Sequence, residues 1–308
     1  ENGRGPSTRR RWPVSSRSWR KSARENGRSF IRTRVVDLGM RRRGFLGALG
    51  VVGIAGLAGC STDDLDPAST PEERRRHLRA MPWPEVSEQS GDWTRTDALS
   101  QYLGQRLGVH TYQKTILLED TAVRRNIREK ANGQFDRRLG QFFATYIDLE
   151  GLTTRAATAS VIADNVAPQI RDRMEQAGIE SVDSAEPTEP LPDVDGETRA
   201  FEGHYETPPF EQTAHVDGIG ERTVGFPSKE LSIRGFATVW KETSGVAFAA
   251  GGVVPTTDYE GRSRTSLTGE RGDGIDLVVD VDMNIPFERM RAEVVAMAES
   301  VEAGSASL

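Results

Sequence analysis

The clearest periodic pattern in the chain is a run of apolar residues at three- and four-residue steps across residues 153–178. Such steps place side chains on one face of an α-helix, which Pro168 is expected to kink and Gly178 to end. A second amphipathic helix is predicted over residues 286–301, with a proline at its start. Its inward positions are Phe287, Met290, Val294, Met297 and Val301.

Weaker patterns predict shorter helices. Thr96 and Asp97 make a plausible cap for a short helix that ends at Leu107. Residues 119–130 show helical spacing of apolar positions among charged ones, and the charged run at residues 71–80 predicts one or two helical turns.

Other stretches have the composition or the alternation that is typical of β-strands. The predicted strands are residues 109–118, 140–150, 199–206, 231–242, 245–255 and 274–283. Two of them flank Thr243 and Ser244, and we expect them to form a hairpin with Gly245 at the turn. Residues 180–198 are acidic and rich in proline, which predicts a loop or hinge.

These elements together predict an α+β fold, a mainly antiparallel sheet with helices packed on one face. We expect a single domain over residues 96–302 if strands pair across the acidic loop. Residues 60–95 contain several prolines and acids and are expected to form a flexible tether. Residues 303–308 are expected to be a disordered tail.

The longest apolar run follows three consecutive arginines, Arg41 to Arg43, and ends at the only cysteine, Cys60. A helix needs roughly 20 apolar residues to cross a bilayer, and this run is shorter. It also contains five glycines, which are costly inside a helix. A basic start, a short apolar run and an abrupt change to polar residues are the layout of an export signal, here over residues 40–59.

Two motifs inside this segment resemble those of prokaryotic lipoproteins. The first resembles a twin-arginine export motif and consists of Arg42, Arg43, Phe45 and Leu46. The second resembles a lipobox and consists of Leu57, Ala58, Gly59 and Cys60. The resemblance implies export in the folded state, lipidation of the Cys60 thiol and cleavage just before it. It covers the signal segment alone, and its implied partners are the export and lipidation machinery and the membrane.

Residues 1–39 contain eleven lysines or arginines and no apolar period. One interpretation is a basic arm that binds nucleic acid, which fits poorly with an export signal directly after it. The interpretation that we favour is an extension upstream of a true start at Met40, so residues 1–39 carry no fold prediction.

The net charge of the chain, −6, conceals an asymmetry. Of 40 basic and 46 acidic residues, 14 and 3 precede residue 61, which leaves 26 basic against 43 acidic residues and a net charge of −17. Only four of those 26 are lysines. An acidic, lysine-poor surface stays hydrated in concentrated salt, and in this the chain resembles uncharacterised haloarchaeal lipoproteins. It argues against a nucleic-acid partner, because a phosphate backbone needs a basic face.

Candidate chemistry is sparse. Because Cys60 is the only cysteine, a disulfide within the chain and a cysteine nucleophile beyond the signal are excluded. Glu202, His204 and Glu206 alternate on one face of a predicted strand, with His215 nearby, and are weak candidates for a metal site. The favoured alternative is the solvated face of a half-buried strand.

Other motifs lack the sequence context that their function would require. The glycine-rich stretches 217–225 and 268–276 lack the lysine and the helix of a phosphate-binding loop and are better explained as turns between strands. The sequence contains no G-x-S-x-G nucleophile motif. It therefore predicts no catalytic residue and no cofactor.

Two functions remain. The favoured one is a non-catalytic binding or envelope-associated domain, lipid-anchored on the outer face of the cytoplasmic membrane, with an unknown protein or small-molecule ligand. The alternative is an exported hydrolase or metal-dependent enzyme whose site is assembled from distant residues. A pocket with convergent Glu, His and Arg side chains would favour the enzyme, and a shallow apolar groove would favour binding.

Overall fold

A computed structural model describes residues 70–87, 92–106, 109–151, 154, 157–188, 190–217, 219–267 and 275–307. The predictions for the upstream segment 1–39, the signal 40–59 and the Cys60 lipidation site lie outside the described residues.

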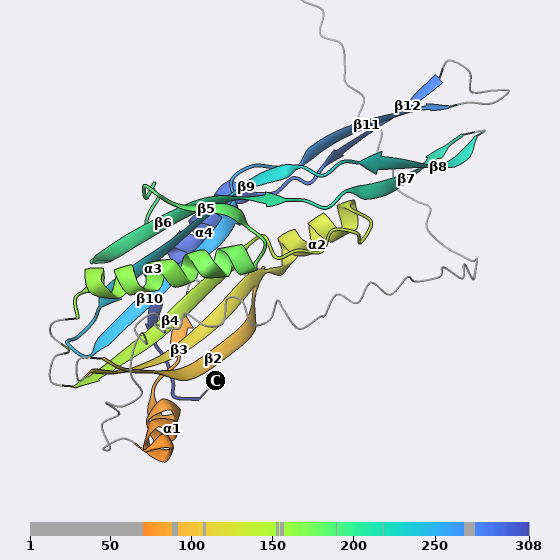
Figure 1. The fold of residues 1–308 in the computed structure, drawn as a ribbon. Coiled ribbons are helices and arrows are strands. Elements are labelled where there is room, and N and C mark those ends of the chain that lie inside the picture. The colour runs from red at the N-terminus through yellow and green to blue at the C-terminus, as the bar shows by residue number, and fades with distance from the viewer. Residues whose placement is uncertain are drawn as a thin grey trace, which may run out of the picture. The chain divides into compact units, whose positions relative to one another are not determined.

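The main structure is an antiparallel sheet of seven strands (Figure 1). In spatial order the strands are β2 (Trp93–Arg106), β3 (Val109–Asp120), β4 (Gln141–Gly151), β10 (Val246–Pro255), β9 (Glu230–Lys241), β6 (Gly196–Glu206) and β5 (Glu180–Ala185). Strands from either side of the acidic loop adjoin, because β4 pairs with β10 along most of its length. The predicted antiparallel sheet is therefore confirmed.

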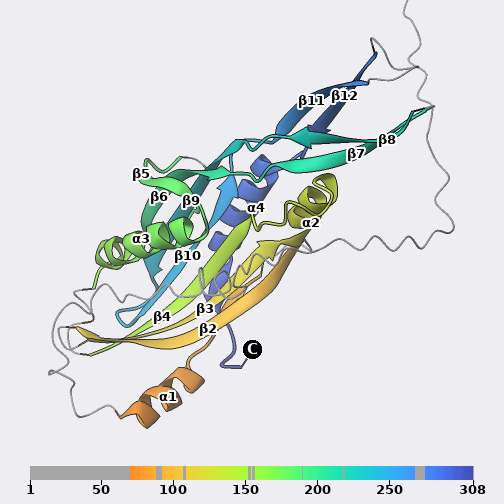
Figure 2. The ribbon, with the colours of Figure 1, turned by 45° about the vertical axis from the view of Figure 1, so that its right-hand side comes forward.

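Helices lie on both faces of this sheet, so their predicted placement on one face is not confirmed (Figure 2). Helix α3 (Ala159–Gln176) covers the face of Gly235, where an added Cβ would lie 3.4 Å from the Met174 sulfur. Helix α4 (Phe287–Glu299) covers the face of Gly252, where a Cβ would lie 2.8 Å from Val294 Cγ1. Gly252 pairs with the residue after Gly235, and side chains alternate along a strand, so the two faces are opposite.

A physical reason for the two-sided cover is visible in the central strands. β3, β4 and β10 are buried at nearly every position, rather than at every second one. A strand that is apolar or small on both faces needs cover on both sides. The hairpin of β9 and β10 and the predicted helix at 119–130, now α2 (Thr121–Lys130), are confirmed.

The predicted helix at residues 96–107 is wrong, because residues 96–106 belong to strand β2. β2 pairs with β3 along its length, with two register shifts, one of them near Gly104 at φ +121°. Asp97 does not cap a helix, and its Oδ1 accepts a hydrogen bond from the Ala98 N–H at 2.8 Å. The sheet edge offered by β3 overrides the local cap signal.

The predicted loop at residues 180–198 is also shorter in the structure, since β5 and the start of β6 lie within it. Helix α3 begins later than predicted, at Ala159. There the Thr158 hydroxyl caps it by accepting a hydrogen bond from the Val161 N–H at 3.3 Å.

The described parts of the predicted tether and tail contain regular structure that contacts the main sheet. Helix α1 (Pro71–Ala80) begins with a capping box between Thr70 and Glu73. Strand β1 (Pro84–Val86) pairs with β13 (Val301–Ala303). The buried Lys114 ammonium donates to the carbonyls of Met81 (2.6 Å) and Ala306 (3.2 Å).

Two further hairpins complete the described elements. One consists of β7 (Phe210–Val216) and β8 (Gly220–Phe226), with most of the glycine-rich stretch 217–225 in its turn and in β8. The other consists of β11 (Glu260–Leu267) and β12 (Ile275–Asp282). The two hairpins run side by side in both views (Figures 1 and 2).

Candidate functional site

A cavity of about 450 Å³ lies on the α4 face of the sheet, between β6, β9 and the start of α4. We call it the β6–β9 groove. Its floor is apolar and its rim carries charges of both signs. The floor and end wall include Ala200, Phe236, Val254 and Phe287, and the rim includes Glu202, His204, Arg234, Glu288 and Arg291.

The register of the strands creates this groove. Ala200 pairs with Phe236, which in turn pairs with Gly252, so two small residues flank one aromatic ring on the same face. Helix α4 packs on β10 through Val294 and leaves Phe236 only partly buried. Thr188 and Leu191, from the segment between β5 and β6, close the groove on one side.

Two guanidinium groups converge at the rim on a single neutral oxygen. Arg234 Nη1 donates to the Thr188 hydroxyl at 2.8 Å, and Arg291 Nη2 donates to the same hydroxyl at 2.9 Å and also to the Thr188 carbonyl. Arg234 has a carboxylate oxygen of Glu202 at 3.6 Å. Within the described part of the chain, Arg291 forms no ion pair. The arrangement thus presents positive charge without full neutralisation.

Glu202 and His204, two of the predicted metal candidates, line this groove, but the set does not converge. Glu202 lies beside Arg234, and His204 Nδ1 lies 3.2 Å from a carboxylate oxygen of Glu230. Glu206 is placed further along β6 and does not line the groove, and His215 is on β7, 69% exposed. Among the described residues, no group of three or more His, Cys, Asp or Glu side chains is placed to hold a metal ion.

One constellation resembles a hydrolytic arrangement. Ser232 on β9 pairs with His204 on β6, so their side chains share a face, and His204 contacts Glu230. The Ser232 hydroxyl forms no hydrogen bond to His204 in the described structure. The side chains of His204 and Glu230 are 47% and 67% exposed.

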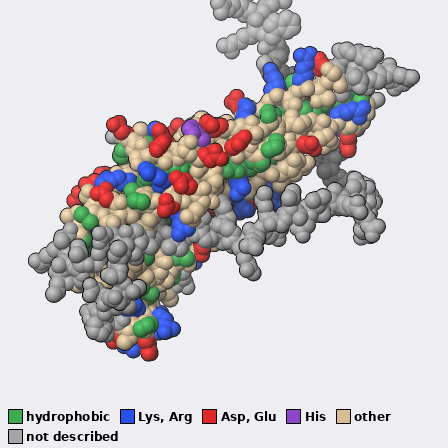
Figure 3. Space-filling model, in the orientation of Figure 1, with side chains coloured by type: hydrophobic (Ala, Val, Ile, Leu, Met, Phe, Trp, Pro, Cys, Tyr) green, Lys and Arg blue, Asp and Glu red, His purple; other side chains and the backbone are tan. Residues whose placement is uncertain are grey.

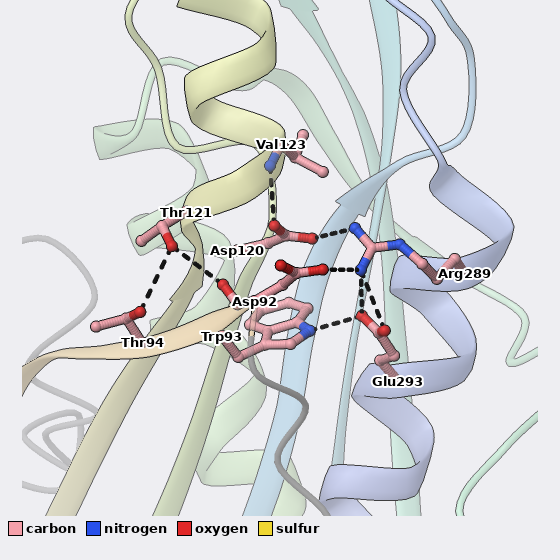
Figure 4. Close-up of polar contacts among 8 residues, drawn as sticks. All are labelled: Asp92, Trp93, Thr94, Asp120, Thr121, Val123, Arg289 and Glu293. Atoms are coloured by element: carbon pink, nitrogen blue, oxygen red, sulfur yellow. Dashed lines mark hydrogen bonds and ion pairs between the residues drawn. The ribbon is translucent and has the colours of Figure 1, made fainter.

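A second polar cluster surrounds Arg289, on the first turn of α4 (Figure 4). Its guanidinium donates to the carboxylates of Asp120 (2.7 Å), Asp92 (3.0 Å) and Glu293 (3.1 Å). Asp120 is fully buried and caps α2 by accepting from the Val123 N–H at 2.9 Å. This cluster joins α4 to the end of β3 and to Asp92, directly before β2, and it does not line the groove, so we assign it a structural role.

His77, which lies within the predicted tether, belongs to a third cluster. His77 Nε2 lies 2.9 Å from Asp148 and Nδ1 lies 3.3 Å from Glu150, while its ring lies 4.2 Å from that of Tyr112. Burial, and then the charge of Glu150, raises the pKa of Tyr112 to about 12. These contacts hold α1 against the sheet.

A second cavity, of about 460 Å³, lies where β1 meets β3 and is lined by Trp83, Glu85, Arg95 and Ile116, among others. It contains one acid and one base, whereas the β6–β9 groove contains two converging arginines. Because of these arginines, the β6–β9 groove is the stronger candidate for a ligand site. On the face of the molecule shown in Figure 3, acidic and basic side chains are interspersed.

Sequence reasoning found Glu202 and His204 but missed Arg234, Arg291 and Thr188. Arg234 could have been found only with the register, since it lies across from Glu202 on the neighbouring strand.

Comparison of the chain with protein-family models, with curated protein sequences and with solved structures finds no match. Within the described residues, none of the helices has the length and apolar character needed to span a membrane.

Proposed function

We propose that the chain is a lipid-anchored binding protein on the outer face of the cytoplasmic membrane, and that the β6–β9 groove holds a small-molecule ligand. The observation that carries the binding proposal is the groove itself. Its volume of about 450 Å³ falls in the range of ligand sites, roughly 300–1,000 Å³. An apolar floor with a few polar groups at the rim is also typical of such sites.

The anchoring part of the proposal is supported by the sequence alone. The twin-arginine motif and the lipobox stand in the right order around a short apolar run. A strongly acidic chain after Cys60 also suits an exposed surface in concentrated salt.

The binding proposal is tested by native mass spectrometry of the protein extracted from membranes. We expect a small-molecule adduct at a one-to-one ratio in the wild-type protein. Ala200→Trp fills the floor of the groove and should remove the adduct, while Ala98→Trp on β2 lies outside the groove and serves as control. An adduct that survives Ala200→Trp, in a variant with an unchanged circular dichroism spectrum, would place the ligand elsewhere.

A second candidate function, an exported hydrolase, is favoured by one observation, the proximity of Ser232, His204 and Glu230. In such a mechanism Ser232 would be the nucleophile, His204 the base and Glu230 the group that orients the imidazole. Hydrolysis of p-nitrophenyl acetate that is lost in both Ser232→Ala and His204→Gln would support the enzyme. Equal rates in the wild type and both variants would exclude these residues.

A further inference from the structure

We infer that Arg234 and Arg291 form an oxyanion subsite in the β6–β9 groove, and that the ligand is a small organic monoanion with an apolar body. This inference rests on the proposed binding function and names the chemical class of its ligand.

The subsite is defined by the convergence of two cations on one oxygen. Arg234 and Arg291 donate to the Thr188 hydroxyl at 2.8 and 2.9 Å, from β9 and from α4. Thr188 is neutral, so it satisfies hydrogen bonds without balancing the two positive charges. A carboxylate oxygen in the same place would form charge-assisted hydrogen bonds, which are roughly twice as strong as neutral ones. The planar guanidinium is also suited to paired bonds with an oxyanion.

Helix α4 adds to the positive potential at this point. Its first residues, Phe287 and Glu288, line the groove, and its N-cap residue Pro286 provides no side-chain cap. The N-terminal end of a helix carries a partial positive charge and orients backbone N–H groups outward. Helix and arginines therefore favour a negative group at the same end of the groove.

The surrounding acids limit how much negative charge the ligand can carry. Glu202 lies 3.6 Å from Arg234, and Glu186 and Glu288 also line the groove. A second negative charge on the ligand would be repelled by these carboxylates. A compact anion with a single charge fits this balance better than a phosphate ester.

The floor determines the rest of the ligand. Phe236, Val254 and Phe287 offer an aromatic and aliphatic surface next to the arginines. Burying apolar area against this surface contributes roughly 25 cal/mol per Å². The ligand is thus expected to combine one carboxylate-like group with an apolar part of about the size of a phenyl ring.

Isothermal titration calorimetry on the full chain with Cys60→Ser tests this inference, with phenylacetate, acetate, phenyl phosphate and benzylamine as probes. We expect phenylacetate to bind most tightly, acetate and phenyl phosphate more weakly, and benzylamine not at all. Arg234→Gln and Arg291→Gln should each weaken phenylacetate binding by about tenfold or more. The lysine variants should retain an intermediate affinity, because they keep the charge without the paired geometry.

Arg222→Gln on β8, outside the groove, is the matched control and should leave the affinity unchanged. Circular dichroism of each variant checks that it is folded. Phenylacetate affinity that is the same in all variants, or no binding of phenylacetate at all, would overturn the inference. If benzylamine binds and Ala200→Trp abolishes it, the binding function stands while the anionic ligand is excluded. If neither an adduct nor any probe binding is found, the binding function fails as well.

Discussion

Glu119 and Asp120 are consecutive residues at the end of β3, and both carboxyl groups are buried. Burial raises the pKa of both carboxyls, although nearby arginines act against the shift: Arg138 and Arg124 for Glu119, and Arg289 for Asp120. Asp136, by contrast, has a lowered pKa, mainly because its carboxylate accepts a hydrogen bond from Arg124. Glu119 and Asp120 therefore have the opposite effect from Asp136 on how stability depends on pH.

Proton linkage determines how the raised pKa values of Glu119 and Asp120 change stability with pH. A carboxyl with a raised pKa binds its proton more tightly in the folded state, so its contribution is greatest below about pH 4 and is lost as the pH rises through the raised pKa. We expect Glu119→Gln with Asp120→Asn to reduce this loss between about pH 4 and pH 7. Urea unfolding of the wild type and the variant across this range measures it.

Asp136→Asn is the control with the opposite sign. Its carboxylate stabilises the folded state above its unfolded pKa, and this contribution is lost as the pH falls through the lowered value. The difference in unfolding free energy between wild type and Asp136→Asn should therefore shrink on acidification. The same pH slope in both variants would contradict the assignment.

Arg289 provides a second prediction at this scale (Figure 4). Its loss leaves the buried carboxylate of Asp120 without its cation, and the guanidinium is itself 35% exposed. Breaking a buried pair costs about 3–5 kcal/mol, so for this partly exposed guanidinium we expect Arg289→Met to lower the unfolding free energy by about 2–3 kcal/mol. Arg262→Met, in the exposed pair with Asp280, should change it little. Equal effects of the two substitutions would contradict a structural role for the cluster.

At the scale of elements, contact between α4 and β10 depends on a glycine. A Cβ on Gly252 would lie 2.5 Å from the Gln141 carbonyl oxygen and 2.8 Å from Val294 Cγ1, so backbone or helix has to move. We expect Gly252→Ala to destabilise the protein by about 1–3 kcal/mol, as overpacking does. Gly225→Ala, with no atom within 4 Å of the added Cβ, is the control. Thermal unfolding of both variants distinguishes them.

At the scale of elements, the sequence predicts part of the fold. The hairpin of β9 and β10 and the long helix α3 follow from local patterns, alternation and turn residues in one case and apolar spacing in the other. The strand β2 is missed because the cap signal at Thr96 and Asp97 favours a helix, whereas residues 96–106 pair with the next strand, β3, in a hairpin. The two-sided cover of the sheet depends on which strands become central, and that is a property of the topology.

The candidate site is also predictable only in part, because local patterns reveal residues of a single strand but not contacts between distant segments. Glu202 and His204 stand out as an alternating polar face in a single strand. Arg234 and Arg291 come together only when β9 and α4 meet around Thr188. In the sequence, Thr188 is 46 residues from Arg234 and 103 residues from Arg291. A short-range pattern cannot encode that convergence.

For the molecule as a whole, anchoring by Cys60 remains a proposal with a direct test. We expect Cys60→Ser to move the protein from the membrane fraction to the medium, because in this proposal the Cys60 thiol accepts the lipid, whereas Ser61→Ala should remain on the membrane. Immunoblots of both fractions measure this. Replacement of Arg42 and Arg43 by lysine should retain the precursor inside the cell. A Cys60→Ser protein that stays on the membrane would contradict the lipobox interpretation.

The central claim, that the β6–β9 groove is a ligand-binding site, is tested most directly by a crystal structure of the protein extracted from membranes. We predict density for a small molecule on Phe236, with an oxyanion within hydrogen-bond distance of Arg234 and Arg291. A groove that is empty, while a copurified ligand occupies another part of the molecule, would contradict the account.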